Sequence, residues 1–423
     1  MDGKLIEEAI SPAKTNGCGP LLRSSQDMSH PLRQQVFEFV RGQGQAARAD
    51  ITHALGISAG SATTLTADLI NCGYLREFEH QAKGTGRGRP KVALEVVAEA
   101  AYVIGIKLAF KQHTGVLADF SGNVIASAAL PAPDGRRSRE QLLNETETLI
   151  AKLLIAGGKA PADIKSVGIG LPGIIDHNTG SIIWSSLLDA RDVDLKQAFA
   201  ERFDIPMALD NDANMVTLAE LWFGQGRSIA DFAVVTVESG VGMGLVLGNQ
   251  LYRGGRGMGL ELGHTKVQMD GALCQCGQRG CLEAYLADYA LIREATTALG
   301  HSFDRGETPE EILDTLFNKA KAGHPAAETI FLRAGQFLSL GLSNVVQLFD
   351  PALIILSGER MKYAQHYAEE MIESMRMLTL NEGRRPCRVA ISDRDDLIWA
   401  RGASALALSD MTTRVLNSEA RTS

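Results

Sequence analysis

Apolar residues follow a helical spacing over the first part of the chain. Four of them fall on one face of a predicted helix: Leu32, Val36, Phe39 and Val40. Pro31 suits the first turn of this helix, and a second short helix is expected over 49–55. Gly56 then allows a tight turn, after which Ser58 can cap a third helix that runs to about Cys72. Helix, glycine turn and capped helix is the order of a helix-turn-helix.

The third predicted helix has a face of small and hydroxylated side chains. Its expected exposed residues are Ser58, Ala59, Gly60, Ser61, Thr63, Thr64 and Thr66, of which all but Thr66 are candidates for DNA contact. Such a face can approach a major groove closely. A glycine-rich loop with Arg87, Arg89 and Lys91 lies between a strand that begins near Leu75 and one at 92–96, which is typical of a DNA-binding wing. Helical hairpins and solvated basic loops also occur without nucleic acid, so the prediction depends on their combination.

Strand-like and helical patterns alternate from residue 100 onward. The expected strands are 103–106, 116–120, 164–169, 232–237, 244–247 and 353–356, and the expected helices are 140–156, 283–299, 308–323 and 325–348. This alternation predicts an α/β body in two lobes. Residues 1–30 show no periodicity and are expected to form a flexible tail.

The charge is unevenly distributed along the chain. Residues 31–92 hold eight Lys or Arg and five Asp or Glu, whereas the whole chain has a net charge of −8. A basic module on an acidic protein favours a polyanionic partner for that module alone. No apolar run has the length of a membrane span, and the polar start does not resemble a secretory signal. Scattered cysteines outside one cluster favour a reducing, cytoplasmic location.

One histidine and three closely spaced thiols lie within residues 261–283. They are His264, Cys274, Cys276 and Cys281. This donor set predicts one closed, tetrahedral, structural zinc ion per chain, because four protein ligands leave no position for water. The alternative is a chance group of free buried thiols. The flanking Glu261 and Glu283 are left to accept hydrogen bonds from a polyhydroxylated ligand.

The chain resembles the ROK family of repressors, open reading frames and sugar kinases, in its transcriptional-regulator branch. The motifs that carry the resemblance are the 257–283 run, Gly170-Leu-Pro-Gly-Ile-Ile-Asp176 and Asn211-Asp212-Ala-Asn. The resemblance implies an N-terminal winged helix-turn-helix over 31–97, followed over 98–423 by an actin-like body with sugar in its cleft. The first lobe is expected at about 98–215 together with the C-terminal helix, and the second at about 216–395.

The resemblance also implies which residues bind the sugar. They are Asn211, Asp212, Glu261, His264 and Glu283. Carboxylates and amides that pair with vicinal hydroxyls give specificity, because a missing hydroxyl leaves a buried polar group without a partner. A turn or a helix cap is the alternative interpretation of the Asn-Asp pair.

The phosphate-binding loop of the related kinases is altered at Lys107–Lys111. Lys107 occupies the position of the family's Asp, Ala109 and Phe110 replace two glycines, and Glu238 lies in the second loop. We therefore expect no enzymatic activity. The predicted function is that of a sugar-responsive repressor that binds a double-stranded operator as a homodimer or homotetramer. The alternatives are a sugar kinase with an appended DNA-binding domain and a regulator that senses a partner protein.

Overall fold

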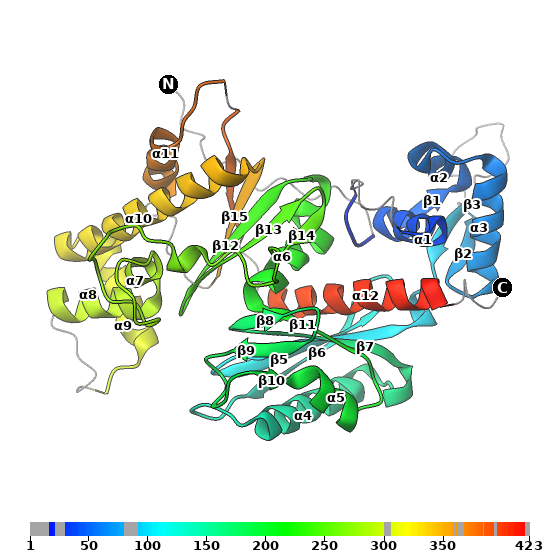
Figure 1. The fold of residues 1–423 in the computed structure, drawn as a ribbon, viewed down its shortest axis with the longest axis horizontal. Coiled ribbons are helices and arrows are strands. Elements are labelled where there is room, and N and C mark those ends of the chain that lie inside the picture. The colour runs from blue at the N-terminus through cyan, green and yellow to red at the C-terminus, as the bar shows by residue number, and fades with distance from the viewer. Residues whose placement is uncertain are drawn as a thin grey trace.

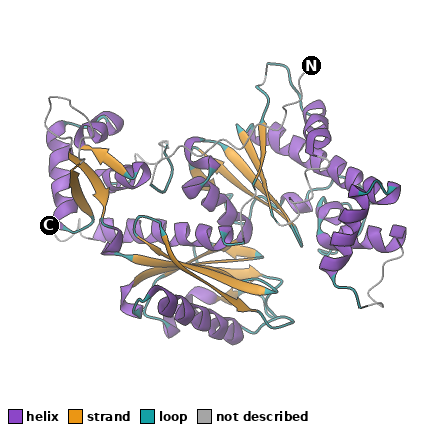
Figure 2. Ribbon diagram, turned by 180° about the vertical axis from the view of Figure 1, so that it is seen from behind, coloured by secondary structure: helices purple, strands orange, loops and turns teal. Residues whose placement is uncertain are grey.

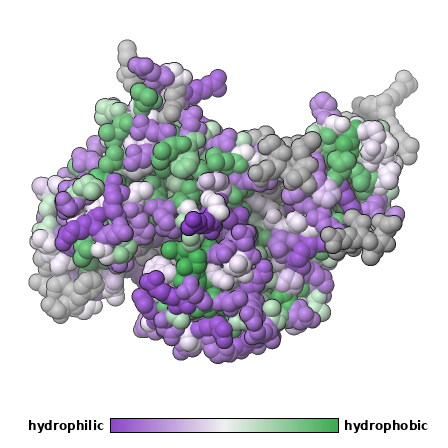
Figure 3. Space-filling view, in the orientation of Figure 1, coloured by the Kyte–Doolittle hydropathy of each residue, from purple (hydrophilic) through white to green (hydrophobic). Residues whose placement is uncertain are grey.

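Two five-stranded β-sheets, each packed against helices, form two lobes, and a three-stranded sheet belongs to a separate N-terminal unit (Figure 1 and Figure 2). This computed structural model describes residues 17–21, 30–79, 92–299, 306–358, 361, 368–383, 385–392 and 396–418. None of the helices in these residues is long and apolar enough to cross a membrane. Hydrophilic side chains cover much of the face shown in Figure 3, with hydrophobic residues scattered among them.

The N-terminal unit, here called the head, covers residues 32–96. Its helices are α1 (Leu32–Gln43), α2 (Arg48–Leu55) and α3 (Ala59–Asn71), and its strands are β1 (Gln45–Ala47), β2 (Leu75–Glu79) and β3 (Val92–Val96). The sheet is antiparallel in the order β1-β3-β2. The three predicted helices are confirmed, whereas β1 was not expected. The predicted wing residues Arg87, Arg89 and Lys91 lie outside the described residues.

Three details of the head correct the sequence prediction. Pro31 is the N-cap of α1 rather than a residue of its first turn. Leu32 is 45% exposed, whereas Phe37 is buried in the core that the head shares with the body. Thr66 is fully buried rather than exposed, because its hydroxyl accepts a hydrogen bond from Arg48 Nε at 3.0 Å and donates one to the Ala62 carbonyl at 2.8 Å.

The expected N-terminal tail is also wrong for residues 17–21, here called the strap. The Cys18 side chain is 2% exposed and belongs to the hydrophobic core that α1 shares with the body. The Cys18 amide donates to the Arg41 carbonyl at 3.1 Å. This part of the chain is therefore held between the head and the body.

Lobe 1 has a mixed sheet of order β11-β7-β4-β5-β6. Its strands are β4 (Tyr102–Lys107), β5 (Gln112–Asp119), β6 (Val124–Pro131), β7 (Ile164–Leu171) and β11 (Met207–Asn211). Helices α4 (Arg139–Gly157) and α5 (Leu195–Arg202) cover one face, and α12 (Ile398–Ser418) covers the other (Figure 1). A small sheet adjoins it, with strands β8 (Ile174–Asp176), β9 (Ser181–Trp184) and β10 (Val193–Asp194). Strand β6 was missed because its alanines and serine give a weak strand signal.

Lobe 2 has a sheet of order β14-β13-β12-β15-β16. Its strands are β12 (Phe232–Val237), β13 (Val241–Leu247), β14 (Gln250–Tyr252), β15 (Leu353–Ser357) and β16 (Arg388–Ile391). Its helices are α7 (Glu283–Leu286), α8 (Asp288–Leu299), α9 (Pro309–Lys321), α10 (Pro325–Phe349) and α11 (Ala368–Leu378). The expected helix over 283–299 is broken, because Ala287 has extended backbone angles and separates α7 from α8.

Helix α6 (Asp212–Phe223) lies between the two lobes and packs against both α12 and β13. Every residue from 213 to 222 is buried, as expected for a helix that is covered on all sides. The expected lobe boundary at residue 215 falls inside this continuous helix. Two glycines of lobe 1 allow a similarly close approach by α12, because a Cβ on Gly105 or Gly168 would lie 2.1 or 2.0 Å from a carbonyl oxygen of α12.

We predict that Gly168→Ala lowers the free energy of unfolding by at least about 2 kcal/mol, because the obstructing atom belongs to backbone and cannot rotate away. Gly60→Ala is the matched control, since a Cβ there would meet nothing closer than Ser58 Oγ at 3.7 Å. That control should change the stability by no more than about 1 kcal/mol. Equal urea midpoints for the two variants would contradict the packing described for α12.

Candidate functional site

The three clustered cysteines lie on a compact loop of lobe 2, beside a short 3-10 helix that ends at His264. Isolated β-bridges pair Lys266 with Cys281 and Leu273 with Arg279, and so fold the loop back on itself. The turn depends on Gly280, which has φ +76° and would place a Cβ 1.8 Å from the Gln268 carbonyl oxygen. The local fold therefore brings together thiols that are separated along the chain.

The potential ligand atoms of His264, Cys274, Cys276 and Cys281 all lie within 4.8 Å of one another. His264 Nδ1 is 3.7 Å from Cys274 Sγ, and Cys276 Sγ is 3.7 Å from Cys281 Sγ. A tetrahedral ion with bonds of about 2.3 Å to sulfur and about 2.0 Å to nitrogen would place its ligands about 3.5 to 3.8 Å apart. The four side chains thus have the spacing that a single metal ion requires.

Burial shapes the electrostatics of this cluster. Cys274 and Cys281 are buried, whereas Cys276 is exposed. Burial raises the pKa of the Cys274 thiol, so a metal ion is needed to favour its ligating thiolate form. Lys266 Nζ lies 2.9 Å from Cys281 Sγ and brings a positive charge to the thiols.

Glu283 connects the cysteine cluster to β13. Its Oε1 is 3.5 Å from Cys274 Sγ, and its Oε2 accepts a hydrogen bond from the Val241 amide at 3.3 Å. The Tyr289 hydroxyl lies 3.5 Å from both Cys274 Sγ and Glu283 Oε1. Tyr289 was not predicted as a site residue. It lies six residues beyond the motif on a separate helix, so its spacing in the sequence does not indicate a role.

Three carboxylates from different elements, those of Asp212, Glu261 and Glu283, influence one another through their charges. Glu261 is largely exposed, yet partial burial of its carboxyl group raises its pKa, and the charges of Asp212 and Glu283 raise it further. His264 opposes that shift. Burial also raises the pKa of Asp212, and the nearby Lys107 opposes it. Four of the five predicted sugar-binding residues therefore influence one another through their charges. They are Asp212, Glu261, His264 and Glu283.

Asn211, the fifth, is the N-cap of α6. Its side-chain oxygen accepts a hydrogen bond from the Asn214 amide at 2.8 Å, so the alternative interpretation as a helix cap is correct for that oxygen. The adjacent Asp210 was not predicted as a site residue. It is buried and forms an ion pair with Arg253 of lobe 2 at 2.6 Å, and it accepts from Asn214 Nδ2 at 2.7 Å. Asp210 therefore links the two lobes close to Asp212, one of the three carboxylates.

The turn between β4 and β5 holds the residues that differ from the kinase motif. Leu108 is fully buried, and Phe110 is 43% exposed. The Ala109 amide donates to His113 Nδ1 at 3.1 Å, and His113 Nε2 lies 2.7 Å from Glu145 Oε2. The Ala109 amide of this turn thus has a hydrogen-bond acceptor within the protein.

The two lysines of the same turn have separate surroundings. Lys107 Nζ lies 3.5 Å above the ring of Trp399. Lys111 Nζ forms an exposed ion pair with Glu310 of lobe 2 at 2.5 Å. A third loop, Leu356-Ser-Gly-Glu359, also departs from the glycine-rich turn of the related kinases, and Glu359 lies outside the described residues.

All residues of α3 and its N-cap that are predicted to contact DNA are exposed. Ser58 is the N-cap, and its hydroxyl accepts a hydrogen bond from the Ser61 amide at 3.0 Å. The exposed residues are Ser58, Ala59, Gly60, Ser61, Thr63 and Thr64. Ala62 and Leu69 are buried and hold the opposite face of α3 against the core of the head.

Two curated proteins are similar to this chain over most of its length. The xylose repressor of Caldicellulosiruptor bescii is 27% identical over 372 residues, which cover 86% of this chain and 92% of that protein. The DNA-binding transcriptional dual regulator NagC of Escherichia coli K12 is 26% identical over 327 residues, which cover 77% of this chain and 79% of that protein.

Solved structures show the same fold. A ROK family transcriptional regulator, described as a homologue of the E. coli MLC protein, has a TM-score of 0.77 at 21% identity and covers 92% of this chain and 97% of its own. The ROK hexokinase of Thermus thermophilus has a TM-score of 0.62 at 28% identity and covers 73% of this chain and 98% of its own. The family model of the ROK family matches residues 103–410. The chain therefore belongs to the ROK family.

Proposed function

We propose that this protein is a sugar-responsive, DNA-binding transcription regulator, most specifically a repressor of genes for carbohydrate uptake or catabolism. The observation that carries the proposal is the exposed, capped face of α3 on a head that is packed against a ROK body in which Asp212, Glu261 and Glu283 influence one another through their charges. The relatives named as xylose and N-acetylglucosamine repressors support the same conclusion.

In the proposed DNA complex, α3 enters a major groove. Its small exposed residues, Thr63 among them, would contact bases and phosphates, while Arg87, Arg89 and Lys91 would contact the backbone or the minor groove. A homodimer or homotetramer would read two half-sites, because helix-turn-helix proteins commonly match operator symmetry with subunit symmetry.

In the proposed sugar complex, side chains from four elements meet the hydroxyls of one ring. Asp212, Glu261 and Glu283 would accept hydrogen bonds, and Asn211 and His264 would complete the set. His264 Nδ1 faces Cys274, so its other ring nitrogen is the one suited to a ligand. A structural zinc ion, held by His264 and the three cysteines, would fix the orientation of that ring.

We propose that this body does not phosphorylate its sugar. Backbone amides approach phosphate closely only where small residues form the loop. Here Phe110 is bulky, and the Ala109 amide already donates to buried His113, which is itself paired with Glu145. The kinase with an appended DNA-binding domain is therefore the weaker alternative. A regulator that senses a partner protein remains the other alternative.

A mobility-shift assay tests the regulator proposal. The purified protein should retain the intergenic DNA upstream of its own gene at moderate salt, and one of D-glucose, D-xylose or N-acetyl-D-glucosamine should change that affinity about 5- to 150-fold. Absence of any retained DNA would refute the proposal. Retention without any sugar effect, together with no heat on titration of the three sugars, would favour the partner-sensing alternative.

We predict that Cys276→Ser lowers bound zinc from about one ion per chain to well below half, because the ion loses a thiolate ligand. Cys276 is the exposed thiol of the cluster, so packing changes little. Cys72→Ser, at an exposed thiol outside the cluster, should keep the full zinc content by elemental analysis. An unchanged zinc content in Cys276→Ser would contradict the ligand set.

We also predict no sugar-dependent ADP release above background with the same three sugars. Asp212→Asn is the diagnostic variant, because the related kinases use this carboxylate as the general base. A coupled ADP assay that detects turnover in the wild-type protein, abolished in Asp212→Asn, would establish the kinase alternative.

A further inference from the structure

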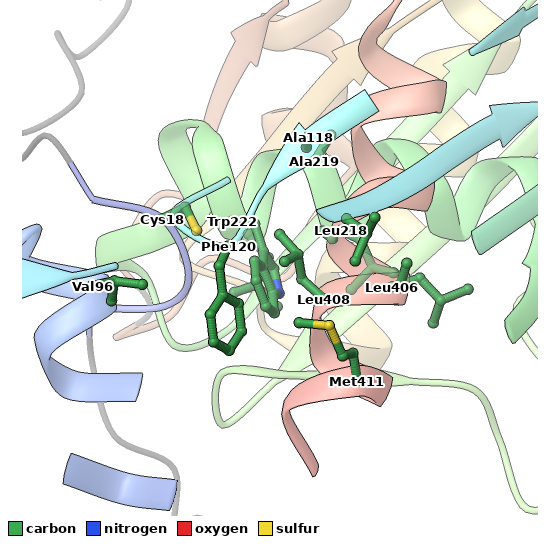
Figure 4. Close-up of a cluster of buried hydrophobic side chains, with 14 of the residues drawn as sticks. Cys18, Val96, Ala118, Phe120, Leu218, Ala219, Trp222, Leu406, Leu408 and Met411 are labelled. Atoms are coloured by element: carbon green, nitrogen blue, oxygen red, sulfur yellow. The ribbon is translucent and has the colours of Figure 1, made fainter. Parts of the chain in front are cut away.

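The head and the body share one hydrophobic core (Figure 4). Phe37 of α1 packs against Phe120, which follows β5, with ring centroids 4.7 Å apart. Trp222 and Leu218 of α6 and Met411 of α12 belong to the same core. A head that is merely tethered by a linker would have a separate core, so this head moves only when its contacts with the body rearrange.

Helix α6 extends from the cluster of Asp212, Glu261 and Glu283 to this shared core. Asp212 is its first residue, and Trp222 lies near its other end. Its 12 residues span about 18 Å at a rise of about 1.5 Å per residue. Packing against its neighbours is tight, because a Cβ on Gly402 of α12 would lie 1.7 Å from the Met215 carbonyl oxygen. A helix enclosed in this way shifts as a rigid unit rather than bending.

The end of α6 is bound to the head through the strap. The Gly19 amide donates to the Trp222 carbonyl at 2.9 Å, and the Arg41 guanidinium lies 4.7 Å above the Trp222 ring. Arg227, just beyond α6, donates through Nε to the Gly19 carbonyl at 2.9 Å and through Nη2 to the Gly42 carbonyl at 2.6 Å. One guanidinium thus joins the body, the strap and α1.

The strap is closely packed at Gly17 and Cys18, and its residues Cys18, Gly19, Pro20 and Leu21 also line a cavity of about 320 Å³. A Cβ on Gly17 would lie 2.2 Å from the Arg41 carbonyl oxygen, and a Cβ on Gly122 would lie 2.6 Å from Cys18 Sγ. Burial raises the pKa of the Cys18 thiol, consistent with its enclosure. A displacement of the end of α6 must therefore be passed to α1 or break these contacts.

We propose that α6 carries the effector signal from the cleft to the head, and that Arg227 with the strap is the joint that transmits it. This inference rests on the proposed function, because it requires that cleft occupancy and DNA affinity are coupled. The coupling free energy then depends on contacts at the joint that differ between the two lobe arrangements.

Arg227→Met tests the joint in the full-length protein. The panel sugar with the largest effect on the wild-type protein should bind the variant within about threefold of its wild-type affinity. The ratio of operator affinities without and with that sugar should fall to below about 3, from a wild-type ratio of about 5 to 150. Arg137→Met is the matched control, because Arg137 is also buried and donates to backbone carbonyls, of Gly135 and Pro133, within lobe 1. That control should retain the wild-type ratio.

The outcomes separate the two proposals. A wild-type protein that fails to bind DNA, or that ignores every sugar of the panel, refutes the proposed function. A responsive wild-type protein with an equally responsive Arg227→Met variant refutes the joint.

If Arg227→Met does not fold, thiol alkylation of the wild-type protein gives a second measurement. Cys18 and Cys387 are both buried, at 2% and 7% exposure, and Cys387 lies in lobe 2 away from the joint. The responsive sugar should change the alkylation rate of Cys18, followed by peptide mass spectrometry, at least about threefold while that of Cys387 stays constant. An unchanged Cys18 rate, in a protein whose operator affinity responds, overturns the inference.

Discussion

The complete burial of α6 between two sheets is the constraint on which the architecture depends. The helix has no solvent-facing stripe, so lobe 1, lobe 2 and α12 must all present complementary surfaces to it. Glycines in β13 and α12 make this possible, because a Cβ on Gly244 would lie 2.0 Å from Thr217 Oγ1 and one on Gly402 would overlap the Met215 carbonyl. The position of Asp212 is thereby fixed by packing along the whole helix rather than by the local loop.

The thiol cluster would stabilise the loop of lobe 2 by a different means. Lobe 2 places His264 and Glu283 on short helical segments that flank an irregular loop, which is held by backbone hydrogen bonds within the loop itself. A bound ion would add four directional bonds to these hydrogen bonds. The ring of His264 and the contact of Glu283 with Cys274 would then hold both groups at fixed positions relative to Asp212.

The sequence predicted the features that depend on local patterns. Ser58 was recognised as a cap, and the spacing of Cys274, Cys276 and Cys281 predicted a metal cluster that the structure brings together. Features that depend on distant contacts were missed. Thr66 looks like a surface residue until Arg48 approaches it, and Asp210 becomes notable only when Arg253 of the other lobe pairs with it. Cys18 lies in a stretch without periodicity, so its burial follows from the joint between head and body and not from its neighbours.

The altered β4–β5 turn and the carboxylates of Glu261 and Glu283 are held by separate parts of the structure. The turn is held within lobe 1 by the hydrogen bond from the Ala109 amide to His113, which is paired with Glu145, whereas Glu261 and Glu283 belong to lobe 2. A substitution at Phe110 or Lys111 therefore leaves the groups proposed to bind sugar in place, whereas the charge of Lys107 acts on Asp212. The Lys111–Glu310 ion pair joins the lobes at the turn, but at an exposed site where such a pair contributes at most about 1 kcal/mol. This exposed pair therefore opposes a change of lobe arrangement less than the Asp210–Arg253 pair does, because the Asp210 carboxylate is buried and would lose its partner.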